Sequence, residues 1–143
     1  MKQTKPNQTK NLEFRIWQER DMELANSLWG DPQVTKYFDK RAKLDETAVK
    51  QRLERELSNM IQHGIQYWKL YTLMDGKFVG CAGLKPRPDG YLEMGCHLLP
   101  SFWRHGFGVE ACVEILSFAF ETIGAKAVYV GHHPQNEGSR KLV

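Results

Sequence analysis

The residues best placed to do chemistry surround two glycines, Gly106 and Gly108, which stand one residue apart where a helix is predicted to begin. The start of a helix leaves backbone N–H groups without partners and carries the positive end of the helix dipole, so it favours an anion such as phosphate. Glycine lets the backbone approach that anion without a Cβ in the way. Arg104, and His105 when protonated, add positive charge there. The loop predicts a site for a phosphate-bearing cofactor or, alternatively, a glycine-rich turn that binds nothing.

Other chemistries fit the sequence less well. Residues 106–111 match the dinucleotide fingerprint GxGxxG/A, but seven residues, Pro100 among them, separate Gly106 from the predicted strand end at Leu98. That fingerprint needs a tight turn directly after its strand, and an acid after the next strand, where this chain has Gly131-His132-His133. The sequence contains no P-loop motif for a nucleotide, no CxxC or HxxxH spacing for a metal and no GxSxG elbow for a serine nucleophile.

The elements that must position the loop form an ordered series. Asp75-Gly76 separates two strand patterns, at 67–74 and 78–84, and is a strong hairpin signal. A second turn rich in proline and glycine leads into a third strand pattern at 91–98. The chain therefore predicts an antiparallel meander that feeds the glycine loop. A helix over 108–123, a short strand over 127–130 and a further helix opening near 136–139 follow.

The segment before the meander is mainly helical. An apolar repeat over 45–63 predicts a long helix, with Asp45 as its N-cap and Gly64 at its end. A helix over 21–29 and a short one after Asp31-Pro32 precede it, and a short strand runs from Leu12 to Trp17. On the long helix, the i,i+4 pairs Lys50–Glu54 and Arg52–Glu56 are expected to lie on solvated outer faces.

Composition limits the class of protein. With 143 residues, 41% hydrophobic and 26% charged, the chain suits one domain, and residues 1–10 are expected to form a disordered tail before a domain over 11–143. The net charge of +3 without a basic stripe gives no argument for nucleic acid. No apolar run is long enough to span a membrane, and no signal peptide is seen. Cys81, Cys96 and Cys112 are expected to be buried, reduced thiols, which predicts a cytoplasmic protein.

The whole pattern resembles the GNAT acetyltransferase superfamily, whose signature is Q/R-x-x-G-x-G/A. Here the matching stretch is Trp103-Arg104-His105-Gly106-Phe107-Gly108, preceded by the strand end Cys96-His97-Leu98. Segments 12–17, 19–21 and 29–34 are similar to the subgroup that contains the ribosomal-protein N-terminal acetyltransferases. Gly95, Pro100, Glu110-Ala111 and Asn136-x-x-Ser139 match that subgroup as well. The resemblance spans residues 12–143.

The resemblance implies acetyl-CoA as co-substrate and no metal. The pyrophosphate would lie on the N–H groups of residues 104–109, and the pantetheine arm would run as a pseudo-strand along the backbones of Cys96 and Leu98. Asn136 matches a residue whose side chain touches the pantetheine arm. The full predicted set for the co-substrate is Cys96, Leu98, Arg104, His105, Gly106, Phe107, Gly108, Val109 and Asn136.

The implied reaction moves an acetyl group from the CoA thioester to a primary amine. Alkyl amines are mostly protonated at neutral pH, so a base is needed. Glu93 is the first candidate and His97 the second, and each has an alternative interpretation: Glu93 as a solvent-facing strand residue, His97 as packing. The position that holds a tyrosine acid in several relatives falls on Val143. Ser139, which matches a position near the thioester sulfur, could assist instead.

The predicted fold class is α/β (α+β): a mixed, mostly antiparallel sheet flanked by helices, with the last strands of the family missing. The chain is therefore expected to be truncated or completed by a partner, for example in a homodimer, since strand 127–130 would otherwise be an exposed edge. The acceptor could be a protein N-terminus, a small amine or an amino sugar. The competing hypothesis is a non-catalytic module that holds CoA or a partner. Four aromatic residues could line the acceptor side but suit a core better: Trp29, Tyr37, Phe38 and Trp68.

Overall fold

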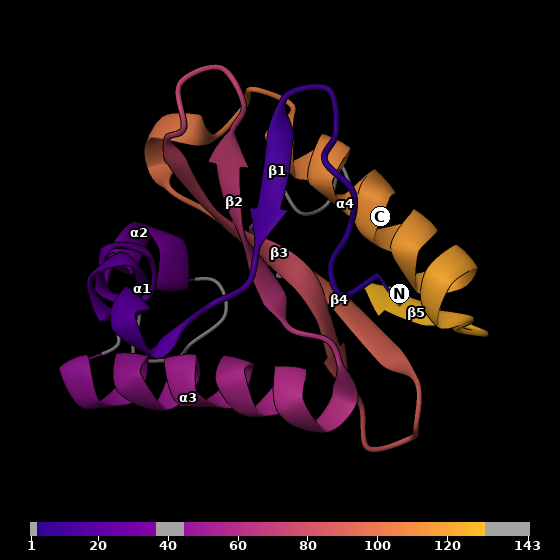
Figure 1. The fold of residues 1–143 in the computed structure, drawn as a ribbon. Helices are drawn as coiled ribbons and strands as arrows, with labels where there is room; N and C mark the ends of the chain where they lie inside the picture. The colour runs from indigo at the N-terminus through magenta and orange to yellow at the C-terminus, as the bar shows by residue number, and fades with distance from the viewer. Residues whose placement is uncertain (1–2, 37–44, 131–143) are drawn as a thin grey trace.

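Five strands form one sheet in the order β1-β2-β3-β4-β5, with helices on both faces (Figure 1). The structure is a computed structural model and describes residues 3–36 and 45–130. The strands are β1 (Leu12–Arg15), β2 (Tyr67–Thr72), β3 (Phe78–Pro86), β4 (Leu92–Leu98) and β5 (Val128–Val130). Neighbours from β1 to β4 are antiparallel, and β4 and β5 are parallel. The predicted fold class is therefore confirmed.

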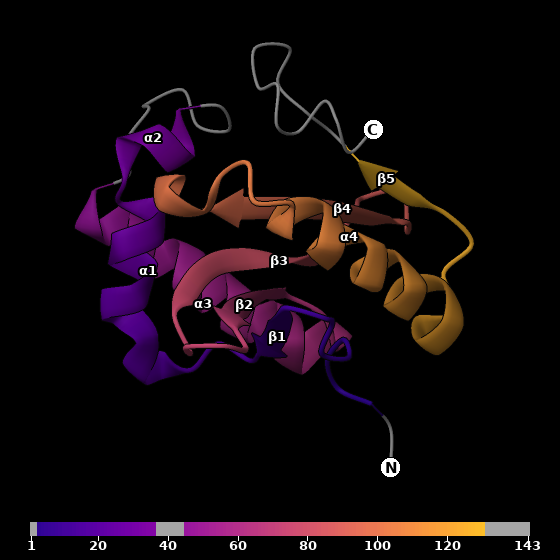
Figure 2. The same cartoon turned by 90° about the horizontal axis from the view of Figure 1, so that it is seen from above.

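The helices lie on the two sides of the sheet, as the view in Figure 2 shows. One side carries α1 (Met22–Trp29), α2 (Pro32–Thr35) and α3 (Glu46–His63), and the other carries α4 (Phe107–Ser117). The predicted caps are confirmed, since Asp31 accepts from the Gln33 amide at 2.8 Å and Asp45 from the Ala48 amide at 2.8 Å. A short 3-10 turn, η1 (Glu19–Asp21), precedes α1, and a second, η2 (Pro100–Phe102), follows β4.

Alternation along the strands sorts the core into two clusters. Leu92, Met94, Cys96 and Leu98 of β4 pack in the cluster under α4, which we call the α4 face. The opposite side holds a cluster built from α1, α3 and the strands, which we call the α1–α3 face. Because successive strand side chains point to opposite faces, Glu93, Gly95 and His97 lie on the α1–α3 face.

The helix predicted over 108–123 is regular for only part of its length. It begins one residue earlier, and after Ser117 it widens into a π-helix, η3 (Phe118–Ile123). The Ala125 amide donates to the Ala119 carbonyl at 2.9 Å, and Gly124 ends the element in a left-handed conformation, φ +82°. The π-helix has a longer repeat than the α-helix, but a segment of 6 residues is too short for the apolar pattern to distinguish them.

The amino-terminal segment over residues 3–10, predicted to be a tail, contains no helix or strand. It runs beside α4, where the Asn7 amide donates to Glu114 at 2.8 Å and the Asn11 side chain donates to Glu110 at 2.7 Å. Thr9 bonds the same Glu110 carboxylate. Two carboxylates on α4 thus hold a polar segment that composition alone could not place.

Two further findings concern the class of protein. Cys81 and Cys112 are buried, Cys96 is partly buried, and all three are free thiols, as predicted. Over the described ranges, no helix has the length and apolar character that crossing a membrane requires.

Candidate active site

The candidate site begins where β4 extends past its last described pair with β5. The parallel pairs are Leu92 with Val128, Glu93 with Tyr129 and Met94 with Val130, after which β4 continues to Leu98 with no further partner on that side among the described strands. The Leu99 amide donates to the Val79 carbonyl of β3 at 2.9 Å. In an antiparallel pair the backbone groups alternate in direction, so those of Cys96 and Leu98 point away from β3. These backbone directions are compatible with the predicted pantetheine edge, which stays a prediction.

The loop that follows carries an amide cradle at the start of α4. Gly106 is the N-cap with φ +80° and offers no side-chain cap, and the first helical bond runs from the Glu110 amide to the Gly106 carbonyl at 3.0 Å. The amides of Phe107, Gly108 and Val109 precede that bond, so they have no intrahelical acceptor. A Cβ on Gly106 would meet nothing within 4 Å, which leaves open space over the cradle.

Arg104 adds an unusual backbone conformation to the same loop. Its φ is +65°, and it is the one residue other than glycine with a positive φ in the described ranges. Such a conformation costs about 1 kcal/mol or more in a residue with a Cβ. Trp103 fixes the loop to the strand end, because its indole N–H donates to the Leu98 carbonyl at 2.8 Å. These features fit a pyrophosphate held by backbone amides.

On the α1–α3 face, the two candidate bases have different surroundings. The Glu93 carboxylate pairs with Lys85 at 3.0 Å and Arg87 at 3.1 Å, and its side chain keeps 27% exposure. His97 accepts a hydrogen bond at Nδ1 from the Trp29 indole at 3.1 Å. Burial lowers the pKa of His97 well below its usual value, so the ring is neutral, and because Trp29 can only donate, the ring proton is on Nε2. The Nδ1 lone pair is therefore already engaged.

A buried charge pair lies behind these residues, and the sequence prediction for it was wrong. Arg52 and Glu56 are 2.8 Å apart, with side-chain exposures of 13% and 2%, instead of facing solvent. Glu56 also accepts from the Tyr67 amide at 2.8 Å, and Arg52 lies over the rings of Trp29 and Tyr67 at 5.1 and 5.0 Å. Burial raises the pKa of Glu56, while Arg52 and the amide oppose that rise. Helical spacing alone does not say which charged pair faces the sheet.

The remaining predicted residues divide between core and undescribed positions. Trp29 and Trp68 are fully buried, which confirms the preference for a core role. Five predicted positions lie outside the described residues: Tyr37, Phe38, Asn136, Ser139 and Val143.

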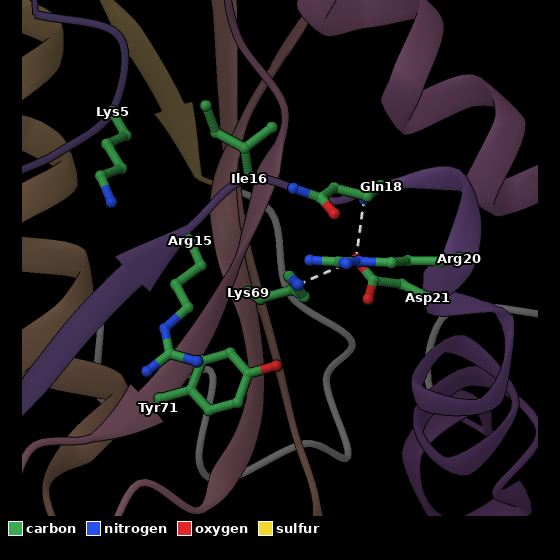
Figure 3. Close-up of a pocket in the computed structure, with 8 residues that line it drawn as sticks. All are labelled: Lys5, Arg15, Ile16, Gln18, Arg20, Asp21, Lys69 and Tyr71. Atoms are coloured by element: carbon green, nitrogen blue, oxygen red, sulfur yellow. Dashed lines mark hydrogen bonds and ion pairs between the residues drawn. The ribbon is translucent and has the colours of Figure 1, made fainter.

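A separate basic groove lies at the β1 side of the α1–α3 face (Figure 3). Its volume is about 450 Å³, and four cationic side chains line it together with Asp21, which accepts from Lys69 at 2.8 Å. Register places Lys69 opposite Cys81, and Cys81 opposite His97, so β3 separates the groove from β4. The groove is therefore distinct from the site at the end of β4. Its lining residues are Lys5, Arg15, Ile16, Gln18, Arg20, Asp21, Lys69 and Tyr71.

Comparison with known proteins agrees with this geometry. Residues 11–143 match the acetyltransferase (GNAT) domain family. The uncharacterized N-acetyltransferase p20 of Bacillus licheniformis is 21% identical over 137 residues, which cover 94% of this chain and 77% of that protein. An acetyltransferase from Agrobacterium tumefaciens superposes with a TM-score of 0.84 at 20% identity, covering 96% of this chain and 80% of its own. A ribosomal-protein alpha-N-acetyltransferase in complex with coenzyme A superposes with a TM-score of 0.78 at 11% identity. The match covers 94% of this chain and 77% of that protein.

Proposed function

This chain belongs to the acetyltransferase (GNAT) family and is an N-acetyltransferase, and on that premise we propose that it moves an acetyl group from acetyl-CoA to the primary amine of a protein N-terminus or a small molecule. The similarity to a ribosomal-protein alpha-N-acetyltransferase favours a protein N-terminus over a small amine. The three free cysteines are in keeping with a reducing, cytoplasmic setting.

One observation carries the proposal: the edge of β4 beyond Met94, which has no partner among the described strands, leads through one loop into the amide cradle of α4. The pantetheine arm is an amide chain, so it can form backbone hydrogen bonds with Cys96 and with the Leu98 amide as an added strand would, while the Leu98 carbonyl already accepts from Trp103. The pyrophosphate then meets the amides of residues 107–109 at the helix N-terminus. Arg104 and His105, both exposed, add charge beside it.

The acceptor amine is proposed to approach from the α1–α3 face. There Glu93 offers a carboxylate that can take the ammonium proton, directly or through water, before the amine attacks. His97 is the weaker candidate because its Nδ1 already accepts from Trp29. Ser139, near the thioester sulfur in the family pattern, is proposed to help protonate the leaving thiolate, and Asn136 to bind the pantetheine arm.

The test uses two glycines with nearly the same backbone conformation. Gly106 and Gly124 have φ of +80° and +82°, and a Cβ on either meets nothing within 4 Å. Gly106→Glu and Gly124→Glu therefore introduce similar backbone strain, but only Gly106→Glu places a carboxylate in the cradle. Calorimetric titration with acetyl-CoA should show affinity falling at least about tenfold in Gly106→Glu, equivalent to about 1.4 kcal/mol, and little change in Gly124→Glu.

Thiol release over a panel of amines and N-terminal peptides separates an enzyme from a module that only binds CoA. Acetyl-dependent thiol release by the wild-type chain supports transfer. Binding without release from any amine would favour the non-catalytic module. Equal acetyl-CoA affinity in Gly106→Glu and wild type would contradict the proposed cradle.

A further inference from the structure

The side chain of Tyr67 crosses the α1–α3 face toward β4 along a row that contains two glycines. Register places Tyr67 of β2 opposite Gly83 of β3, and Gly83 opposite Gly95 of β4. A Cβ on Gly95 would lie 2.7 Å from Tyr67 Cζ and still closer to the hydroxyl oxygen. Position 95 must therefore be glycine for the phenol to rest on the β4 backbone.

This contact lies one residue beyond the last pair that the structure describes between β4 and β5. The last paired residue of β4 is Met94, and Gly95 is the first beyond it. The hydroxyl of Tyr67 thus lies beside Gly95, next to the stretch of β4 edge where the proposed pantetheine arm would place its thioester. Two residues further along β4 is His97, whose ring centroid is 5.5 Å from that of Tyr67.

Tyr67 is held firmly in this position. Its amide donates to Glu56 at 2.8 Å, and its carbonyl accepts from the Trp17 indole at 2.5 Å. Arg52 lies 5.0 Å over its ring, and the residue is only 4% exposed. Within the part of the chain that the structure describes, the hydrogen bonds of Tyr67 are made by its backbone, and its hydroxyl has no partner. Burial raises the pKa of Tyr67, so the hydroxyl keeps its proton at neutral pH and is available as a donor.

We propose that the Tyr67 hydroxyl donates a hydrogen bond to the carbonyl oxygen of the acetyl group, an inference that rests on the function proposed above. In the transfer, the amine lone pair forms the new C–N bond and the carbonyl π pair moves onto oxygen, where the phenol stabilises the charge. The pair on oxygen then re-forms the C=O bond as the C–S bond breaks, sulfur leaves with the C–S electron pair, and the proton lost by the amine goes to solvent or base. Tyr67 keeps its own proton throughout.

The kinetic test compares Tyr67→Phe with Tyr71→Phe. Both remove a phenolic hydroxyl from the same face of β2, but Tyr71 lines the basic groove and not the β4 row. We expect kcat to fall about 10²-fold in Tyr67→Phe, the size seen when one donor to a developing oxyanion is lost. The KM for acetyl-CoA should change less than about twofold, and Tyr71→Phe should behave like wild type.

A second measurement does not depend on turnover. The carbonyl ¹³C resonance of bound, carbonyl-labelled acetyl-CoA should shift from its free value in wild type and Tyr71→Phe, and return toward it in Tyr67→Phe. If wild type turns over and the bound resonance in Tyr67→Phe is the same as in wild type, this inference is overturned and the proposed function is not. Failure of wild type to bind acetyl-CoA would overturn the proposed function, and this inference with it.

Discussion

The two faces of β4 work in different ways. On the α4 face, the side chains of β4 are apolar core, and the chemistry is left to backbone groups along the edge and at the start of α4. On the α1–α3 face, the same strand carries Glu93, which pairs with Lys85 of β3 and with Arg87, and His97, which accepts from Trp29 of α1. One short stretch of sequence can form a site made of backbone groups. A site made of side chains needs residues from segments that are distant in the sequence.

The largest effect on stability is expected from a substitution that breaks the Arg52–Glu56 pair on the α1–α3 face. Glu56→Gln leaves Arg52 buried without a counter-charge, so the free energy of unfolding should fall by about 3–5 kcal/mol. Urea unfolding measures this loss. Glu54→Gln, exposed on the same helix, is the control and should stay within about 0.5 kcal/mol of wild type. A loss below about 1 kcal/mol in Glu56→Gln would mean that water reaches the pair.

A matched pair of glycine substitutions compares the two faces directly. Gly95→Ala forces the Tyr67 ring to move and should cost about 1–3 kcal/mol. Gly108→Ala brings a Cβ only to 3.6 Å from Leu98 Cδ1, an ordinary contact, and alanine favours the helix, so stability should hold or rise by up to about 1 kcal/mol. Thermal unfolding of both variants checks this, and equal losses would contradict the asymmetry between the faces.

A smaller effect concerns pH. Because the pKa of His97 is lowered in the folded state, the unfolded chain binds more protons below about pH 6.5. His97 therefore carries no penalty above that pH, and stability is lost as the pH falls below it, by at most about 1.4 kcal/mol per pH unit. Urea unfolding from pH 7.5 to 5.5 should show a shallower decline for His97→Gln than for wild type. Parallel curves would mean that His97 is not held neutral.

The features that could be predicted from the sequence are those set by local patterns of residues, such as helix ends and turns. The ends of α3 follow from Asp45 and Gly64, the β2–β3 hairpin from Asp75-Gly76, and the loop before α4 from its glycines. Other features depend on tertiary contacts. Which charged pair of α3 faces the sheet is decided by packing against Tyr67, and the order of residues 3–10 by carboxylates on α4.

Tyr67 shows the same limit on the acceptor side. Its part in the site could have been suspected only from Gly83 and Gly95, since glycine inside a strand often marks the close approach of another group. Neither residue says which side chain approaches, because that depends on strand register across β2, β3 and β4.

Amide hydrogen exchange along β4 tests the central claim most directly. If acetyl-CoA adds to the free edge of β4, the amides of Cys96 and Leu98, which point away from β3, should exchange more slowly when it is bound. The amides of His97 and Leu99 already face β3 and should change little. Protection of Cys96 and Leu98 in this alternating pattern is the predicted result. Uniform protection of all four amides, or none at saturating acetyl-CoA, would contradict it.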